Sequence, residues 1–128
     1  MNLRRTLGLL ALLLWAGCNT PSVPLPPPSP DDFDVMVSSQ SQFVLSGDPQ
    51  QTRPAARYEI YNVTLGRGVI VKAGADGAFV SPPMEGRAAD EIEISYQLGP
   101  EESDYISGVL CVILPATSRA LSEADRCP

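Results

Sequence analysis

The feature that most constrains this chain is a repeated alternation of apolar and polar residues, which begins at residue 32. The clearest example is residues 91–96, where Ile92, Ile94 and Tyr96 alternate with two glutamates and a serine. A period of two places alternate side chains on opposite faces of a β-strand. The dipeptide Asp76-Gly77 has the sequence of a tight hairpin turn. No long stretch with the period of a helix occurs before the tail, so the pattern predicts an all-β domain.

Six or seven short runs of this kind follow one another, with turn signals about every ten residues. The runs cover residues 33–37, 42–45, 58–64, 69–72, 78–80, 91–96 and 108–114. This spacing predicts an antiparallel β-sandwich of about seven strands. Aromatic residues make up only 6% of the chain, so we expect a core mostly of Val, Ile and Leu. The last run is apolar on both faces, which predicts a central strand, and residues 118–124 are expected to form one helical turn.

The segment from Tyr58 to Leu114 resembles the small bacterial immunoglobulin-like modules of exported proteins. The matching features are residues 60–63, the Gly66 turn, residues 69–71, the hairpin sequence of residues 73–79 and the alternating run of residues 89–94. Ala89 stands where these modules usually have Gly before Asp90. Carboxypeptidase regulatory-like domains share the Asp-Gly-(small)-Phe turn and are the alternative. Both resemblances imply an immunoglobulin-like sandwich used for spacing, display or binding.

The N-terminus has the features of an export signal. Arg4 and Arg5 precede an apolar run of about ten residues, which is too short to span a bilayer. Ala16-Gly17-Cys18 then resembles the lipobox of bacterial lipoproteins, although Trp15 stands where Leu, Val or Ile is usual. The resemblance implies a signal peptide over residues 1–17 and an acylated Cys18. The alternative is an ordinary secretory signal that leaves Cys18 as a thiol.

Residues 19–30 contain six prolines, which exclude helix and central strand and favour an extended spacer. We therefore expect a lipidated cysteine and tether over residues 18–30 and a domain over residues 31–128. Asn19 follows the cysteine, and the lipoprotein resemblance then implies the outer membrane, on its periplasmic face or at the cell surface. The expected partners are the membrane, through the lipid, and an envelope protein.

If Cys18 carries lipid, Cys111 and Cys127 remain as a pair in an oxidising compartment. A disulfide between them would pin the C-terminal tail to the sheet. The alternative is two free thiols. A redox role is not expected, because the chain has no Cys-x-x-Cys motif and no His to lower a thiol pKa.

Composition argues against several function classes. The chain lacks His, the commonest general base and metal ligand. Removing residues 1–17 leaves seven basic against 15 acidic residues, a balance of −8 that argues against nucleic acid. Lys72 is the only lysine and has no spaced serine, so we predict no catalytic residues, no cofactor and no enzyme.

The other candidate site residues are explained more simply by structural roles. Asp76, together with Asp31, Asp32 and Asp34, suggests at most a dispersed calcium site, and we predict no metal. Glu91 with Glu93, and the acids at 101, 102 and 104, are expected on a solvated face and a loop. The Asn62-Val63-Thr64 sequon is expected to be a strand end. The alternative function is an exported carbohydrate- or calcium-binding module, with Tyr58, Tyr61, Tyr96 and Tyr105 as the candidate sugar-stacking residues.

Overall fold

The computed structural model describes residues 24–99 and 105–128, and their regular structure is β-strand apart from two short 3-10 turns. One sheet contains β1 (Phe33–Val37), β2 (Gln42–Gly47), β5 (Phe79–Val80), β6 (Met84–Glu85) and β9 (Arg119–Ala120). The other contains β3 (Arg57–Asn62), β4 (Arg67–Lys72), β7 (Glu91–Gln97) and β8 (Leu110–Ile113). The two turns are Pro30–Asp32 and Glu123–Asp125. The predicted all-β fold is confirmed. The additional strands, β6 and β9, have two residues each, too few to show a period.

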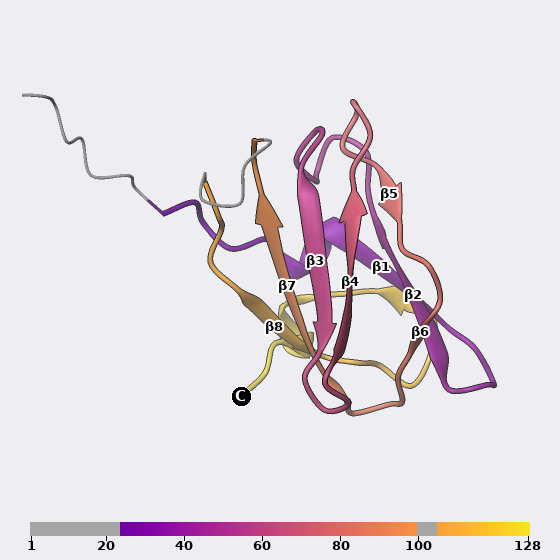
Figure 1. Cartoon of the computed structure of the whole chain (residues 1–128). Coiled ribbons are helices and arrows are strands. Elements are labelled where there is room, and N and C mark those ends of the chain that lie inside the picture. Colours follow the sequence, from indigo (N-terminus) through magenta and orange to yellow (C-terminus); the bar gives the residue numbers. More distant parts are fainter. Residues whose placement is uncertain (1–23, 100–104) are drawn as a thin grey trace, which may run out of the picture.

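Along the chain, two consecutive strands lie in one sheet and the next two lie in the other (Figure 1). The strand orders are β5-β2-β1-β9, with β6 also pairing with β2, and β4-β3-β7-β8. Strand β7 thus returns to lie beside β3, the first strand of the preceding hairpin, and all strand pairs are antiparallel. Crossing between two antiparallel sheets in this order gives the Greek-key connections of an immunoglobulin-like sandwich.

The core lies between the two sheets. As expected, Val, Ile and Leu supply most of its side chains, but all three phenylalanines are also buried. Tyr58 links the two sheets at one end of the core. Its ring stacks on Phe79 with centroids 4.7 Å apart and meets Phe33 edge-on at 5.9 Å. Its hydroxyl accepts a hydrogen bond from the backbone N–H of Arg53 at 2.8 Å. Burial of aromatic surface is therefore concentrated around one residue.

The hairpin before β5 requires the predicted Asp-Gly pair. Gly77 has φ +92°, and a Cβ on it would lie 2.3 Å from the carbonyl oxygen of Thr52. The Asp76 carboxylate accepts a hydrogen bond from the backbone N–H of Ala78 at 3.0 Å. Asp76 is therefore a turn former, as expected.

The prediction that residues 108–114 form a central strand is wrong. Strand β8 lies at the end of its sheet and pairs only with β7 among the named strands. Its outward side chains, Cys111 and Ile113, are half-buried. The C-terminal tail lies along the free side of β8: Val112 forms an isolated bridge with Arg126, and the N–H of Cys127 donates to the carbonyl of Cys111 at 3.1 Å. The tail therefore covers the edge of β8 that no named strand pairs with.

The tail itself differs from the expected helical turn over residues 118–124. It contains β9, which pairs with β1, and then the 3-10 turn Glu123–Asp125. Asp125 fixes this turn. Its carboxylate accepts hydrogen bonds from Ser122 N–H at 2.9 Å and from the guanidinium of Arg119. These bonds, Arg119 foremost, lower the pKa of Asp125 to about 2.

The described end of the expected tether lies against the domain. Leu25 forms a parallel bridge with Ser107, and the N–H of Gly108 donates to its carbonyl at 3.0 Å. Pro28 and Pro30 are buried. The chain therefore enters the domain beside the segment that leads into β8.

Candidate binding face

The outward-pointing side chains of the four-stranded sheet form the candidate site. Alternation along β3 and β7 turns Tyr58, Ile60, Ile92 and Ile94 into the core. It turns Arg57, Glu59 and Tyr61 of β3, and Glu93 and Ser95 of β7, to the opposite side. The strand register places Glu59 between Ile70 of β4 and Ser95 of β7. We call this surface of β4-β3-β7-β8 the outer face.

Four apolar side chains remain exposed on the outer face. Ile70 is 70% exposed, Val109 56%, Ile106 53% and Tyr61 37%. Single exposed apolar residues are ordinary, but a group of them on one face is typical of an interaction surface. The group comes from β3, from β4 and from the segment before β8.

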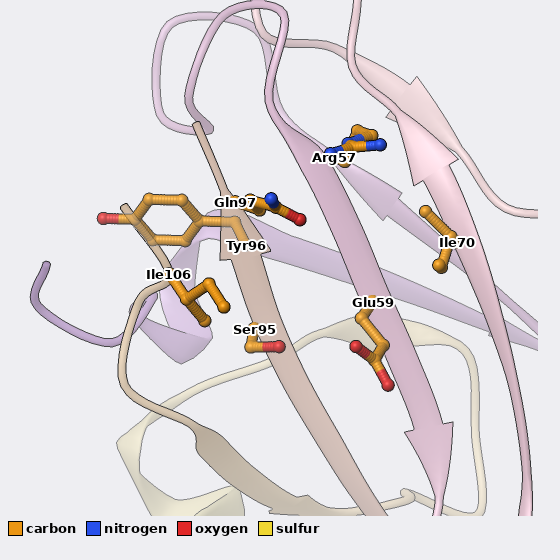
Figure 2. Close-up of a pocket in the computed structure, with 7 residues that line it drawn as sticks. All are labelled: Arg57, Glu59, Ile70, Ser95, Tyr96, Gln97 and Ile106. Carbon is orange, nitrogen blue, oxygen red and sulfur yellow. The ribbon is translucent and has the colours of Figure 1, made fainter. Parts of the chain in front are cut away.

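Shallow hollows run across the outer face. One has a volume of about 100 Å³. Figure 2 shows its lining, to which β3 contributes Arg57 and Glu59, β4 contributes Ile70, and β7 contributes Ser95 and Gln97. A second, of about 330 Å³, is lined by Glu59, Tyr61, Glu93, Ser95 and Val109. A third, of about 460 Å³, lies between Glu59, Tyr61 and β4. Glu59 lines all three, so the face has an acidic centre and an apolar border.

One polar group on this face lacks a partner. The Nη2 atom of Arg57 is buried and has no hydrogen bond within the described part of the chain. A buried donor without an acceptor is unfavourable. Because this atom is buried, a molecule bound on the surface does not reach it. The accessible part of the face therefore offers apolar contact and carboxylates.

The predicted disulfide is present. The structure joins Cys111 of β8 to Cys127 of the tail, with the Cα atoms 5.4 Å apart. The bond holds the tail against β8 and lies on the outer face. Cys18, the predicted lipidation residue, lies outside the described residues, as does the signal peptide over residues 1–17.

The tyrosines divide into two groups. Tyr58 and Tyr96 are buried in the core, at 1% and 3% exposure, so neither can stack on a sugar. Tyr61 lies on the outer face, and Tyr105 is 62% exposed. The prediction that most of the four are core or strand-face residues is confirmed. Tyr61 lines two hollows of the outer face beside Glu59, and Tyr96, although buried, lines the hollow of about 100 Å³.

Three of the four aspartates considered for calcium, Asp32, Asp34 and Asp76, interact with nearby groups of the protein. The Asp32 carboxylate accepts a hydrogen bond from Ser29 N–H at 3.0 Å and caps the turn Pro30–Asp32. Burial, and after it the neighbouring Asp48, raise the pKa of Asp34 above its ordinary value. Over residues 24–99 and 105–128, no group of three His, Cys, Asp or Glu side chains is arranged to hold a metal ion.

The structure does not bring the remaining candidate residues together in one site. Glu91 and Glu93 both lie on β7 and face outward, but only Glu93 lines a hollow. Residues 101, 102 and 104 lie outside the described residues. Asn62 of the sequon is fully buried, and its amide donates to the Asp90 carboxylate at 3.0 Å and to the Glu85 carbonyl at 3.2 Å. It is a strand end, as expected.

Comparison with protein-family models, with curated proteins and with solved structures finds no match for this chain. Among the described residues, no helix is long and apolar enough to cross a bilayer. The outer face is therefore defined by its own geometry. Sequence reasoning missed Arg57, Ile106 and Val109. Ile106 lies outside every predicted run, and Val109 lies in the run of residues 108–114, which predicted a central strand and not an exposed side chain.

Proposed function

We propose that this protein is a non-enzymatic bacterial envelope lipoprotein whose immunoglobulin-like domain binds a protein partner through the outer face. The observation that carries the proposal is the group of four exposed apolar side chains around the acidic centre at Glu59. Apolar patches with a polar border favour macromolecular contact. The shallow hollows suit the side chains of a protein surface better than an enclosed small molecule.

The sequence supports the membrane-anchored part of the proposal. The basic residues, the apolar run and Ala16-Gly17-Cys18 favour lipidation of Cys18 and retention at the outer membrane. The proline-rich segment would hold the domain away from the lipid. The described end of that segment enters beside β8, which leaves the outer face of β3 and β4 uncovered by it.

The chemistry of the face favours binding over catalysis. Ser95 lies opposite Glu59 on the neighbouring strand. A serine nucleophile needs a base such as His or Lys within reach, and the chain contains no His. Its only lysine, Lys72, lies at the end of β4, opposite Arg57. We therefore propose no reaction and no cofactor.

A carbohydrate ligand is the second candidate, and Tyr61 is the observation that favours it. Tyr61 shares the 330 Å³ hollow with Glu59, Glu93 and Ser95. An aromatic face beside hydrogen-bonding groups is a common arrangement for sugars. Binding of envelope glycans that is abolished by Tyr61→Ala but unaffected by Ile106→Asp, which lies outside this hollow, would favour this candidate over a protein partner.

Site-specific photo-crosslinking in intact cells tests the protein-binding proposal. A benzophenone amino acid at Val109 is expected to capture an envelope protein, identifiable by mass spectrometry. The same residue at Met36 is the matched control, because Met36 is also 56% exposed but lies on β1 of the other sheet. Glu59→Lys in the Val109 variant should lower the yield about tenfold, which corresponds to about 1.4 kcal/mol. Equal adducts at both positions, or none at Val109, would contradict the proposal.

A further inference from the structure

Three of the four sheet edges in the described chain are short or covered. Strand β9 has two residues, and β5 and β6 have two each, with Pro82 and Pro83 between them. The edge of β8 is covered by the tail and its disulfide. Strand β4 differs: it has six residues, and its only partner in the described chain is β3. Long open edges are normally protected, because they can pair with another strand.

The hydrogen-bond pattern shows which residues of β4 face the open edge. The N–H of Ala73, just after β4, donates to the carbonyl of Ala56 beside β3 at 2.8 Å. In an antiparallel pair, the backbone groups of successive residues point alternately toward and away from the partner strand. Gly68, Ile70 and Lys72 therefore direct their N–H and C=O groups to the open edge.

A second copy of β4 fits this edge in one register. If two β4 strands run antiparallel about a two-fold axis at Ile70, Ile70 pairs with its own copy and Gly68 pairs with Lys72 of the other copy. In this register, every residue whose backbone groups face the open edge is paired, and the two strands form about six backbone hydrogen bonds. It also places Val69 opposite Val71 on the side facing the cores. Shifting the register by two residues places Ile70 opposite Gly68 or Lys72 and loses the contact between the two isoleucines.

Charge and shape agree with the same register. A Cβ on Gly68 would lie 2.8 Å from the Tyr61 ring, so Tyr61 already leans over this position. Lys72 of the second copy, opposite Gly68, would extend toward that ring and toward Glu59, which lies in the same hollow. A cation beside an aromatic ring and a carboxylate is favourable. In this register no two basic residues lie directly opposite each other, because Arg67 faces Ala73.

We propose that two copies of this chain pair through β4 and join their four-stranded sheets into one continuous sheet. This inference goes beyond the proposed function, because it supplies a second copy as partner and makes the two outer faces continuous. A contact centred on one strand is small, so we expect dimerisation to depend on concentration. Anchoring in one membrane would raise the effective concentration.

Cysteine crosslinking of the full chain in membranes tests both the pairing and its register. Ile70→Cys is expected to form a disulfide-linked dimer under mild oxidation, since the paired Cα atoms would lie about 5.5 Å apart. Val80→Cys is the matched control: Val80 is 66% exposed, against 70% for Ile70, but lies on β5 of the other sheet. Lys72→Cys should crosslink poorly, because the two copies of this position would be offset along the strands by about 13 Å.

A second measurement distinguishes a specific dimer from crosslinking between molecules that collide at random. Ile70→Lys places two cations at the two-fold axis, so the detergent-solubilised full chain should shift from dimer to monomer in analytical ultracentrifugation. Ile70 is largely exposed, so folding should be unaffected.

Three results would overturn the proposal. The first is a dimer yield for Ile70→Cys no higher than that for Val80→Cys or Lys72→Cys. The second is an adduct of Ile70→Cys with a different protein instead of a second copy. The third is an unchanged mass for Ile70→Lys. The Val109 crosslink reports the proposed function independently of these results.

Discussion

At the scale of single residues, Ala89 shows how a departure from a sequence pattern is accommodated. The resemblance to immunoglobulin-like modules, which stays a prediction from the sequence, implies Gly at this position. Ala89 has φ 73°, in the left-handed region that glycine adopts without strain. The chain therefore keeps glycine-like backbone geometry with an alanine, at a cost of about 1–2 kcal/mol.

Ala89→Gly should therefore stabilise the domain. The strain relieved exceeds the extra entropy of the unfolded chain, and we expect a gain of about 0.5–1 kcal/mol in the free energy of unfolding. Urea denaturation measures it. Ala88→Gly is the matched control, because Ala88 is also exposed and has no positive φ. It should lose stability, and a gain of equal size in both variants would refute the argument.

Asp125 is predicted to make the domain sensitive to acid. Its hydrogen bonds with Arg119 lower its pKa from 3.8 to about 2 in the folded state. A carboxyl with a depressed folded-state pKa contributes stability that is complete above its unfolded pKa and is lost as the pH falls toward the folded value. The contribution of Asp125 should therefore disappear between about pH 4 and pH 2.

Asp125→Asn provides the test, by thermal unfolding at pH values from about 7 to about 2. The variant should be less stable than the wild type at neutral pH, and the difference should shrink as the pH falls below about 4. Asp31→Asn is a control at an exposed aspartate. A difference that stays constant over the whole range would show that the Arg119 interaction does not act through charge.

At the scale of elements, one buried amide connects two strands and two turns. The Asn62 amide donates to Asp90 and to the carbonyl of Glu85, while its oxygen accepts from Leu65 N–H at 3.1 Å. The bonds connect the end of β3, the following turn, β6 and the turn before β7. Asn62 is fully buried, and removing its side chain takes a hydrogen bond from each of these partners, although the Asp90 carboxylate keeps the bond from Arg87 N–H at 2.9 Å.

Asn62→Ala should therefore destabilise the domain by about 2–4 kcal/mol, since it leaves buried polar groups without partners. Thr64→Ala is the matched control. It also removes the sequon, but it breaks only one exposed hydrogen bond, from Glu91 N–H, and should cost about 1 kcal/mol or less. Chemical denaturation distinguishes the two. Similar small losses in both variants would contradict the role assigned to Asn62.

The sequence predicts the strands better than it predicts their neighbours. Alternation identifies β3 and β7 because each buries one face. It misplaces β8, because the edge of this strand is covered by a tail that approaches from beyond residue 118 and not by another long strand. Strands β6 and β9 are too short to show a period. Which edge stays open depends on the tail and on Pro82 and Pro83, so the exposure of β4 follows only from the assembled structure.

At the scale of the whole molecule, the outer face is a product of tertiary packing. Local sequence fixes which residues of β3 and β7 point away from the core. It does not indicate that Ile106 and Val109 lie beside them, since those residues belong to a connection held by Leu25 and Gly108. The disulfide, by contrast, was predictable from the number of cysteines and the predicted export signal.

The central claim is that this domain acts at a membrane to which a lipid on Cys18 anchors it. The most direct test is the intact mass of the native protein from the membrane fraction, before and after reduction. We predict the mass of residues 18–128 plus acyl chains, with a gain of two hydrogens on reduction from the Cys111–Cys127 bond. A mass without acyl chains, or one that begins elsewhere in the chain, would contradict the anchor and favour a freely diffusing exported domain.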